Sequence, residues 1–247
     1  MTMRILLIRG MVVGLVAAVA SLVFAWIFGE PQINLAITVE EHHAHGGAAA
    51  DPEQFSRTVQ QTLGLAAGLG LFGVAMGGLF AVTFAIAYTR IGQFSARATS
   101  AIVAGAGFAA VSLIPALKYP ANPPGVGGSD TVGSRSGVYV VMIAVSVAIV
   151  VVSAQVTKHL AERLGGWNAT LAGAALAIVL VAIAYLLLPD VNEVPANFPA
   201  TVLWQFRIAS LGMHAVFWIT LGLGFGALTE RRLSLRQQTR PATATVN

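Results

Sequence analysis

Six long apolar stretches decide what this 247-residue chain can fold into. Each has about the 20 residues that a helix needs to cross the hydrocarbon core of a bilayer. None carries Lys, Arg, Asp or Glu in its centre, and the stretches are 10–28, 63–88, 98–117, 138–157, 169–188 and 208–228. Their length and lack of strict alternation favour helices over strands. The sequence therefore predicts an all-α, polytopic membrane protein, a bundle of six transmembrane helices.

The composition supports a lipid environment. Charged residues make up 10% of the chain and hydrophobic residues 56%, whereas a soluble domain carries roughly 25% charged residues. The net charge of +4 comes from residues at helix ends and in the tail, so it does not indicate a nucleic-acid partner. Cysteine is absent, which excludes disulfides and thiolate metal sites.

The basic residues predict the orientation. Assigned to alternating sides, four lie on one side (Arg57, Lys118, Arg135 and Arg207), and ten lie on the other. The side rich in Lys and Arg is expected to be cytoplasmic. Both termini are then inside, in a multi-pass protein of the cell (inner or plasma) membrane. Residues 1–229 form the transmembrane domain, with an outer loop at 29–62, and residues 230–247 form a basic cytoplasmic tail that is expected to be disordered.

Glycines four residues apart predict close helix contacts. Such pairs let two backbones approach in lipid, and the chain has four of them: Gly10/Gly14, Gly64/Gly68, Gly73/Gly77 and Gly222/Gly226. The contacts are either internal or between subunits of a homo-oligomer, and the sequence leaves both open. Trp218 lies in the middle of its apolar stretch and is expected to pack inside.

Two outer connections resemble each other. Pro-Ala-Asn-x-Pro occurs at 120–124 and again at 195–199, 75 residues later, and an arginine follows each before the next helix (Arg135 and Arg207). The similarity indicates either a parallel repeat of helical hairpins or independent proline-rich helix ends. The polar residues around these connections either converge at the outer mouth of the bundle or simply meet the headgroups: Lys118, Asn122, Arg135, Asn192, Glu193 and Arg207.

A histidine cluster is the clearest candidate for chemistry. Glu40, Glu41, His42, His43 and His45 lie within the predicted outer loop. Imidazole and carboxylate together suit borderline divalent ions such as zinc, nickel and cobalt. The cluster is interpreted as a metal-capture site, and the alternative is a solvated polar loop.

Other residues are candidates for an ion pathway that continues beyond the loop. Glu30, Asn122 and Glu193 are predicted to form an oxygen-rich outer site, with Arg207 at the same mouth. His214 lies seven residues after Arg207, roughly 10 Å deeper at 1.5 Å per residue. Ionisable groups at such depth usually face protein or a water-filled cavity. His214 is either a deeper ion station or a donor of one interhelical hydrogen bond.

Catalytic and nucleotide-binding motifs are absent from the sequence. It contains no GxxxxGK[ST], no HExxH and no Ser-His-Asp pattern. The protein is therefore not expected to be an enzyme or to bind a permanent cofactor.

Five segments carry a family resemblance: FGEP at 28–31, LKYPANPP at 117–124, WNAT at 167–170, NEVP at 192–195 and LWQFR at 203–207. With them the chain resembles the CbtA family of predicted cobalt transporter subunits. The resemblance implies cobalt (Co²⁺) uptake, alongside a small His-bearing membrane partner subunit. The prediction is a membrane subunit that captures or passes a divalent metal from the outer face. One alternative is a non-transporting accessory or assembly subunit, and another is a transporter of an anionic or organic solute that binds Lys118, Arg135 and Arg207.

Overall fold

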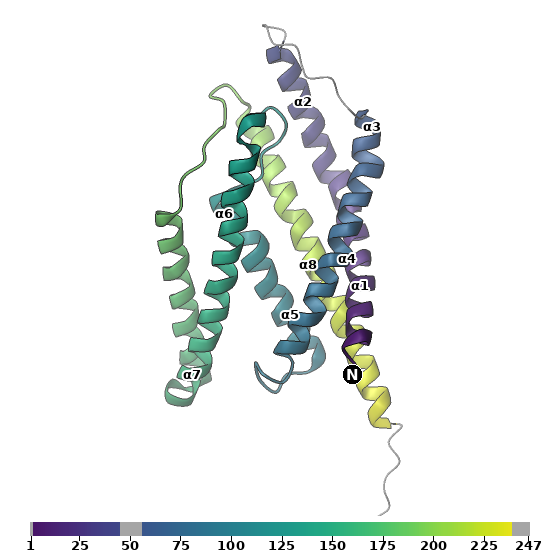
Figure 1. The fold of residues 1–247 in the computed structure, drawn as a ribbon, viewed down its shortest axis with the longest axis vertical. Helices are drawn as coiled ribbons and strands as arrows, with labels where there is room; N and C mark the ends of the chain where they lie inside the picture. The colour runs from purple at the N-terminus through teal and green to yellow at the C-terminus, as the bar shows by residue number, and fades with distance from the viewer. Residues whose placement is uncertain (1, 45–55, 239–247) are drawn as a thin grey trace, which may run out of the picture. The chain divides into compact units, whose positions relative to one another are not determined.

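A computed structural model describes residues 2–44 and 56–238, and every regular element in these ranges is helical (Figure 1). Five of the helical segments are long and apolar enough to cross a membrane: Met3–Glu41, Arg57–Ala87, Ala96–Lys118, Val132–Leu187 and Ala200–Arg232. Only 22–33% of each most apolar window is buried. The remaining apolar side chains face outward, which is the pattern of helices surrounded by lipid.

Three of these segments contain a π-helical turn. The first joins α1 (Met3–Phe24) through η1 (Ala25–Gly29) to α2 (Glu30–Ala44), and the second joins α3 (Arg57–Val59) through η2 (Gln60–Gly64) to α4 (Leu65–Ala87). The third joins α5 (Ala96–Gly107) through η3 (Phe108–Leu113) to α6 (Ile114–Lys118). A short 3₁₀ turn, η4 (Ser129–Thr131), precedes α7 (Val132–Leu187), and α8 (Ala200–Gln238) completes the described chain.

Two regions are more helical than the sequence suggested. Residues 29–62 were expected to be a loop, but α2 continues the first helix to Ala44. Its only proline, Pro31, lies at the start of α2, just after the π-helical turn η1, and no glycine interrupts residues 32–44. The segment expected to be a tail from residue 230 likewise begins as helix, since α8 runs to Gln238.

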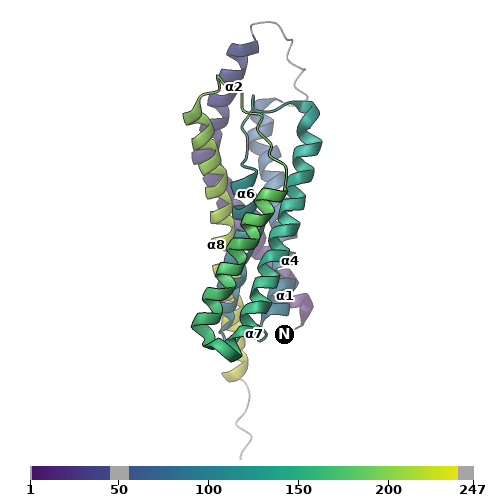
Figure 2. The same cartoon turned by 90° about the vertical axis from the view of Figure 1, so that its left-hand side faces the viewer.

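Helix α7 is a helical hairpin. Its 56 residues would extend about 84 Å if straight, far more than a bilayer of roughly 30 Å. Gly165 interrupts it with φ 74° and ψ 160°, a backbone region that is essentially restricted to glycine. The two arms lie side by side in both views (Figures 1 and 2). The predicted helices at 138–157 and 169–188 are these two arms.

The chain divides into two compact units. The first unit comprises Met1–Ala20, Gly68–Gly105 and Phe217–Asn247, and the second comprises Ser21–Ala67 and Ala106–Val216. In the first unit, α1 and α4 meet through glycines. A methyl group built on Gly10 or Gly77 would overlap the other residue's carbonyl oxygen, and Gly14 and Gly73 are related in the same way. Two of the four predicted glycine pairs therefore form one internal helix contact.

A second contact in the first unit involves α5 and α8. The buried Ser100 hydroxyl donates a hydrogen bond of 2.7 Å to the Gly222 carbonyl oxygen. Gly226 lies against Arg97 and Ser100, where an added Cβ would be 3.0 Å from backbone and side chain. Trp218 is only 5% exposed and meets the edge of Phe80 at a centroid distance of 6.5 Å. Its predicted inward position agrees with the structure.

In the second unit, the arms of α7 pack on the end of α6. Tyr119, Met142, Ile149 and Ala184 form a buried cluster. Elsewhere in the unit, Ala36 of α2 packs against Val126 and Phe198, which belong to the two proline-rich connections. These contacts hold both connections beside α2.

Candidate functional site

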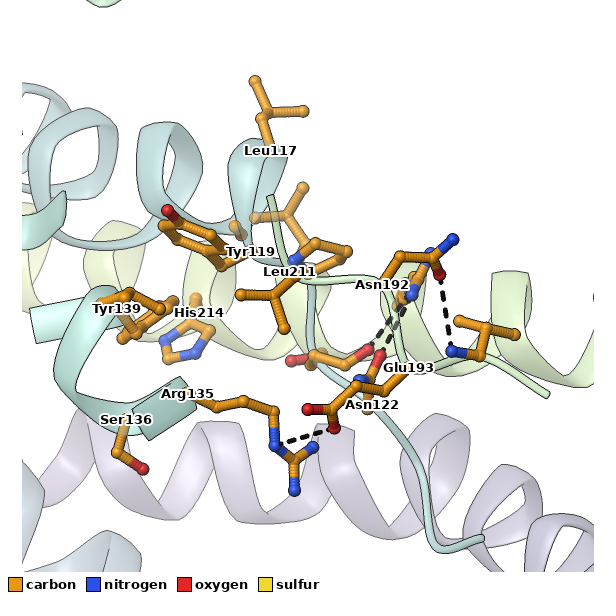
Figure 3. Close-up of a pocket in the computed structure, with 18 of the residues that line it drawn as sticks. Leu117, Tyr119, Asn122, Arg135, Ser136, Tyr139, Asn192, Glu193, Leu211 and His214 are labelled. Atoms are coloured by element: carbon orange, nitrogen blue, oxygen red, sulfur yellow. Dashed lines mark hydrogen bonds and ion pairs between the residues drawn. The ribbon is translucent and has the colours of Figure 1, made fainter. Parts of the chain in front are cut away.

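A cavity of about 720 Å³ lies within the second unit (Figure 3). Its lining comes from four segments: the end of α6 with the following connection, the start of α7, the connection after α7, and the first half of α8. Both proline-rich connections contribute residues to it. The polar and ionisable lining residues include Asn122, Arg135, Ser136, Tyr139, Asn192, Glu193, Arg207, Ser210 and His214.

Arg135 and Glu193 form an ion pair in this cavity. Arg135 Nε lies 3.2 Å from Glu193 Oε2, and about a quarter of each side chain is exposed (Figure 3). The Thr131 hydroxyl also donates to Glu193 Oε2, at 3.0 Å. On its other side Arg135 donates from Nη2 to the Gly128 carbonyl oxygen at 3.1 Å. One ion pair and one hydrogen bond therefore hold the carboxylate in place.

Arg207 is held differently. Its Nη2 donates to Asn122 Oδ1 at 3.0 Å, and its Nε donates to the Ala121 carbonyl oxygen at 3.3 Å. No carboxylate pairs with Arg207 in the part of the chain that the structure describes. The two arginines thus bind crosswise: the arginine that follows each connection contacts the other connection.

A separate set of bonds anchors the beginnings of the two connections. Lys118 Nζ donates to the Tyr185 carbonyl oxygen at 2.9 Å and forms an ion pair with Asp190. The Tyr119 hydroxyl donates to the Pro189 carbonyl oxygen at 2.7 Å, and the Tyr185 hydroxyl donates to that of Ile114 at 2.6 Å. The ends of α6 and α7 are thereby tied together, which fixes where both connections begin.

His214 lines the cavity from α8 and is partly buried. No hydrogen bond or ion pair joins its imidazole to any other described residue. The interhelical hydrogen bond considered as an alternative role is therefore not formed with the described part of the chain. A neutral imidazole without a partner keeps a nitrogen lone pair free to accept a proton or bind a metal ion.

Four of the five residues predicted for the outer mouth or a pathway below it line this one cavity: Asn122, Glu193, Arg207 and His214. Glu30, the fifth, is elsewhere in the second unit. Its carboxylate forms an ion pair with Arg57, whose guanidinium also lies 3.4 Å from Asn34 Oδ1. The sequence predicted an oxygen-rich site of Glu30, Asn122 and Glu193. Asn122 and Glu193 line the cavity, whereas Glu30 does not line it and is paired with Arg57.

The capture cluster lies largely outside the described residues. Glu40 and Glu41 are exposed near the end of α2, while His45 and the side chains of His42 and His43 are outside the described part. Glu40 lies against the first proline-rich connection, because a Cβ built on Gly125 would be 3.2 Å from Glu40 Cβ. Within residues 2–44 and 56–238, no group of three or more His, Asp or Glu could hold a metal ion.

Sequence reasoning missed several lining residues, including Tyr139 and Ser210. The helical spacing contained the signal. Tyr139 is four residues after Arg135, and Ser210 and His214 are three and seven residues after Arg207. Such spacings place side chains on one helix face, so each arginine marked the face that borders the cavity.

Comparison with known proteins gives the family. A family model described as "Probable cobalt transporter subunit (CbtA)" matches residues 3–230. The chain belongs to the CbtA family. Searches of curated proteins and of solved structures return no match.

Membership places this CbtA-family chain among membrane transport proteins associated with cobalt, and the family is one of transporter subunits, not of enzymes. The five apolar helical segments agree with a multi-pass membrane protein in contact with lipid.

Proposed function

We propose that this protein is the membrane subunit of a cobalt uptake system and that its cavity holds the cargo during passage. The family match over residues 3–230 supports cobalt transport. The location of the cargo site is supported by one observation: Asn122, Glu193, Arg207 and His214 all line the same cavity.

The ligand types in the cavity suit cobalt. Co²⁺ binds imidazole nitrogen well and accepts carboxylate and amide oxygens. His214 supplies the imidazole, which has no partner among the described residues, and Glu193 supplies a carboxylate positioned by Arg135 and Thr131. Asn122 adds an amide whose oxygen accepts from Arg207. An incomplete ligand set of this kind holds an ion loosely enough to release it, as transport requires.

The topology that we propose has six membrane crossings. The two arms of α7 count as two crossings, because Gly165 reverses the chain between them. The distribution of Lys and Arg then puts both termini in the cytoplasm and both proline-rich connections outside. Residues 1–229 form the membrane domain in the cell membrane, and residues 230–247 form a basic cytoplasmic tail. In this orientation the cavity opens toward the outer face.

We further propose that the histidine cluster delivers cobalt to the cavity. Helix α2 packs through Ala36 on Val126 and Phe198, and Glu40 lies against Gly125. The end of α2 therefore adjoins both connections that line the cavity. Glu40, Glu41, His42, His43 and His45 would capture the ion there and pass it to Glu193 and His214. A small His-bearing partner subunit or a second copy of the chain would complete the system.

Cobalt accumulation in cells tests this proposal. Cells that express the wild-type protein are expected to accumulate more radioactive cobalt than cells that lack it. His214→Ala should raise the cobalt concentration for half-maximal uptake on the order of tenfold or more, since even residues that only support a metal ligand change affinity roughly 10–100-fold. The matched control is His159→Ala, which removes an exposed histidine outside the cavity. Equal uptake by wild-type and His214→Ala cells would refute the assignment, and equal uptake with and without the protein would refute transport.

A further inference from the structure

The cavity is larger than a hydrated metal ion needs. A divalent ion with about six waters occupies roughly 200 Å³ at ~30 Å³ per water, whereas the cavity measures about 720 Å³. Cavities of roughly 300–1,000 Å³ are typical of sites for small organic molecules. The volume therefore accommodates a metal ion together with an organic ligand.

The lining is amphipathic. Tyr119, Tyr139, Trp204, Ile208 and Leu211 contribute apolar surface beside the polar residues. A hydrated cation gains little from the aliphatic part of such surface, because its ligands are polar atoms and water. An organic molecule buries carbon atoms against it and gains from the hydrophobic effect.

The charge balance also disfavours a hydrated cation. The cavity is lined by two guanidinium groups, of Arg135 and Arg207, but by one carboxylate, of Glu193. Glu193 is paired with Arg135, which leaves Arg207 as a positive charge without a counter-ion among the described residues. Like charges repel more strongly in a partly buried site than in water. A cargo with net negative charge removes this repulsion.

Arg207 is prepared to bind an anionic group. Its contacts with Asn122 and Ala121 use Nη2 and Nε, and Nη1 has no partner among the described residues. A guanidinium that neutral acceptors already orient loses little further freedom when it binds a carboxylate. His214 lines the same cavity from the same helix, two turns further along.

We infer that the cavity binds cobalt as an anionic chelate with a carboxylate-bearing organic acid, with Arg207 binding a carboxylate of the chelator and His214 binding the metal. This inference rests on the proposed function and names its cargo. The chelator supplies further oxygen ligands, because the residues that line the cavity include only one carboxylate. The apolar wall contacts the carbon skeleton of the chelator.

Binding to the purified full-length protein in neutral detergent tests the inference, with His42, His43 and His45 changed to Ala so that the proposed capture cluster does not take up cobalt. The probes are cobalt citrate, which is an anionic complex, cobalt chloride alone and citrate alone, each titrated by isothermal calorimetry. Cobalt citrate is expected to bind at least about tenfold more tightly than either cobalt or citrate alone. Arg207→Gln should weaken the binding of cobalt citrate on the order of tenfold, as expected for a lost hydrogen bond to a charged group, and should leave cobalt alone unaffected. Arg207→Lys should restore part of the loss.

Controls separate this inference from the proposed function. Arg163→Gln removes an exposed arginine outside the cavity and should change nothing, and a melting curve of each unliganded variant shows whether it is folded. If cobalt alone binds as tightly as cobalt citrate, and only His214→Ala weakens it, the inference fails and the proposed function stands. If no form of cobalt binds, both fail. Equal binding of citrate without cobalt, or displacement by added phosphatidylglycerol, would mean a simple anion or lipid site and would overturn the inference.

Discussion

The contact between α1 and α4 predicts that one added methyl group destabilises the protein. Gly77→Ala places a Cβ against the Gly10 carbonyl oxygen and 3.1 Å from Gly14 Cα. All of these neighbours are backbone atoms, which cannot rotate away as a side chain would. The helices must separate or shift, and neighbouring contacts along the interface weaken with them.

The magnitude follows from overpacking and helix propensity. Overpacking a close contact costs typically 1–3 kcal/mol, and about 2 kcal/mol is expected here because the obstacle is backbone. The gain in helix propensity from glycine to alanine is up to about 1 kcal/mol. Gly68→Ala is the matched control in the same helix, since a Cβ at Gly68 has nothing within 4 Å. Gly77→Ala should be destabilising on balance, whereas Gly68→Ala should be neutral or stabilising.

Thermal unfolding in detergent measures the difference. For a chain of this length, each kcal/mol shifts the melting temperature by roughly 2–4 °C. At a fixed heating rate, Gly77→Ala is expected to melt several degrees below wild type, and Gly68→Ala at or above it. Equal melting temperatures for the two variants would show that α1 and α4 do not meet through these glycines.

Two other substitutions have matched controls. Gly165→Ala should destabilise the α7 hairpin by about 1–3 kcal/mol, because Gly165 has φ 74°. The control Gly166→Ala, where an added Cβ has no neighbour within 4 Å, should not destabilise it. Equal melting temperatures of the two variants would contradict the chain reversal at Gly165. Ser100→Ala removes the buried hydrogen bond to Gly222 and should lower the free energy of unfolding by roughly 0.6–1.7 kcal/mol. The control Ser134→Ala removes an exposed hydrogen bond and should leave the melting temperature unchanged. An unchanged melting temperature for Ser100→Ala would argue against the contact between α5 and α8.

Local sequence was sufficient to predict the helices but only some of their contacts. The apolar stretches specify helices because each stretch is long and continuous. Glycine spacing identified the contact of Gly10 and Gly14 with Gly73 and Gly77. The same spacing at Gly64 and Gly68 has no close partner, because spacing shows that a surface is flat but not what covers it.

Several residues that line the cavity could be singled out from the sequence, but their pairing could not. The repeated proline-rich motif drew attention to Asn122, Glu193 and the following arginines. The crosswise arrangement, in which Arg207 binds Asn122 85 residues away, depends on how the hairpins pack. No local pattern contains that information. The pairing of Glu30 with Arg57, 27 residues away, depends on the fold in the same way.

The central claim is that His214 binds cobalt inside the cavity. Pulsed electron paramagnetic resonance of Co²⁺ bound to the purified protein, with citrate present, detects a directly coordinated imidazole through its remote nitrogen. A variant with His42, His43 and His45 all changed to Ala should keep this nitrogen signal, because His214 remains. Adding His214→Ala to that variant should abolish the signal. A signal that survives the fourth substitution, or cobalt that binds without any nitrogen signal in the wild-type protein, would contradict the account.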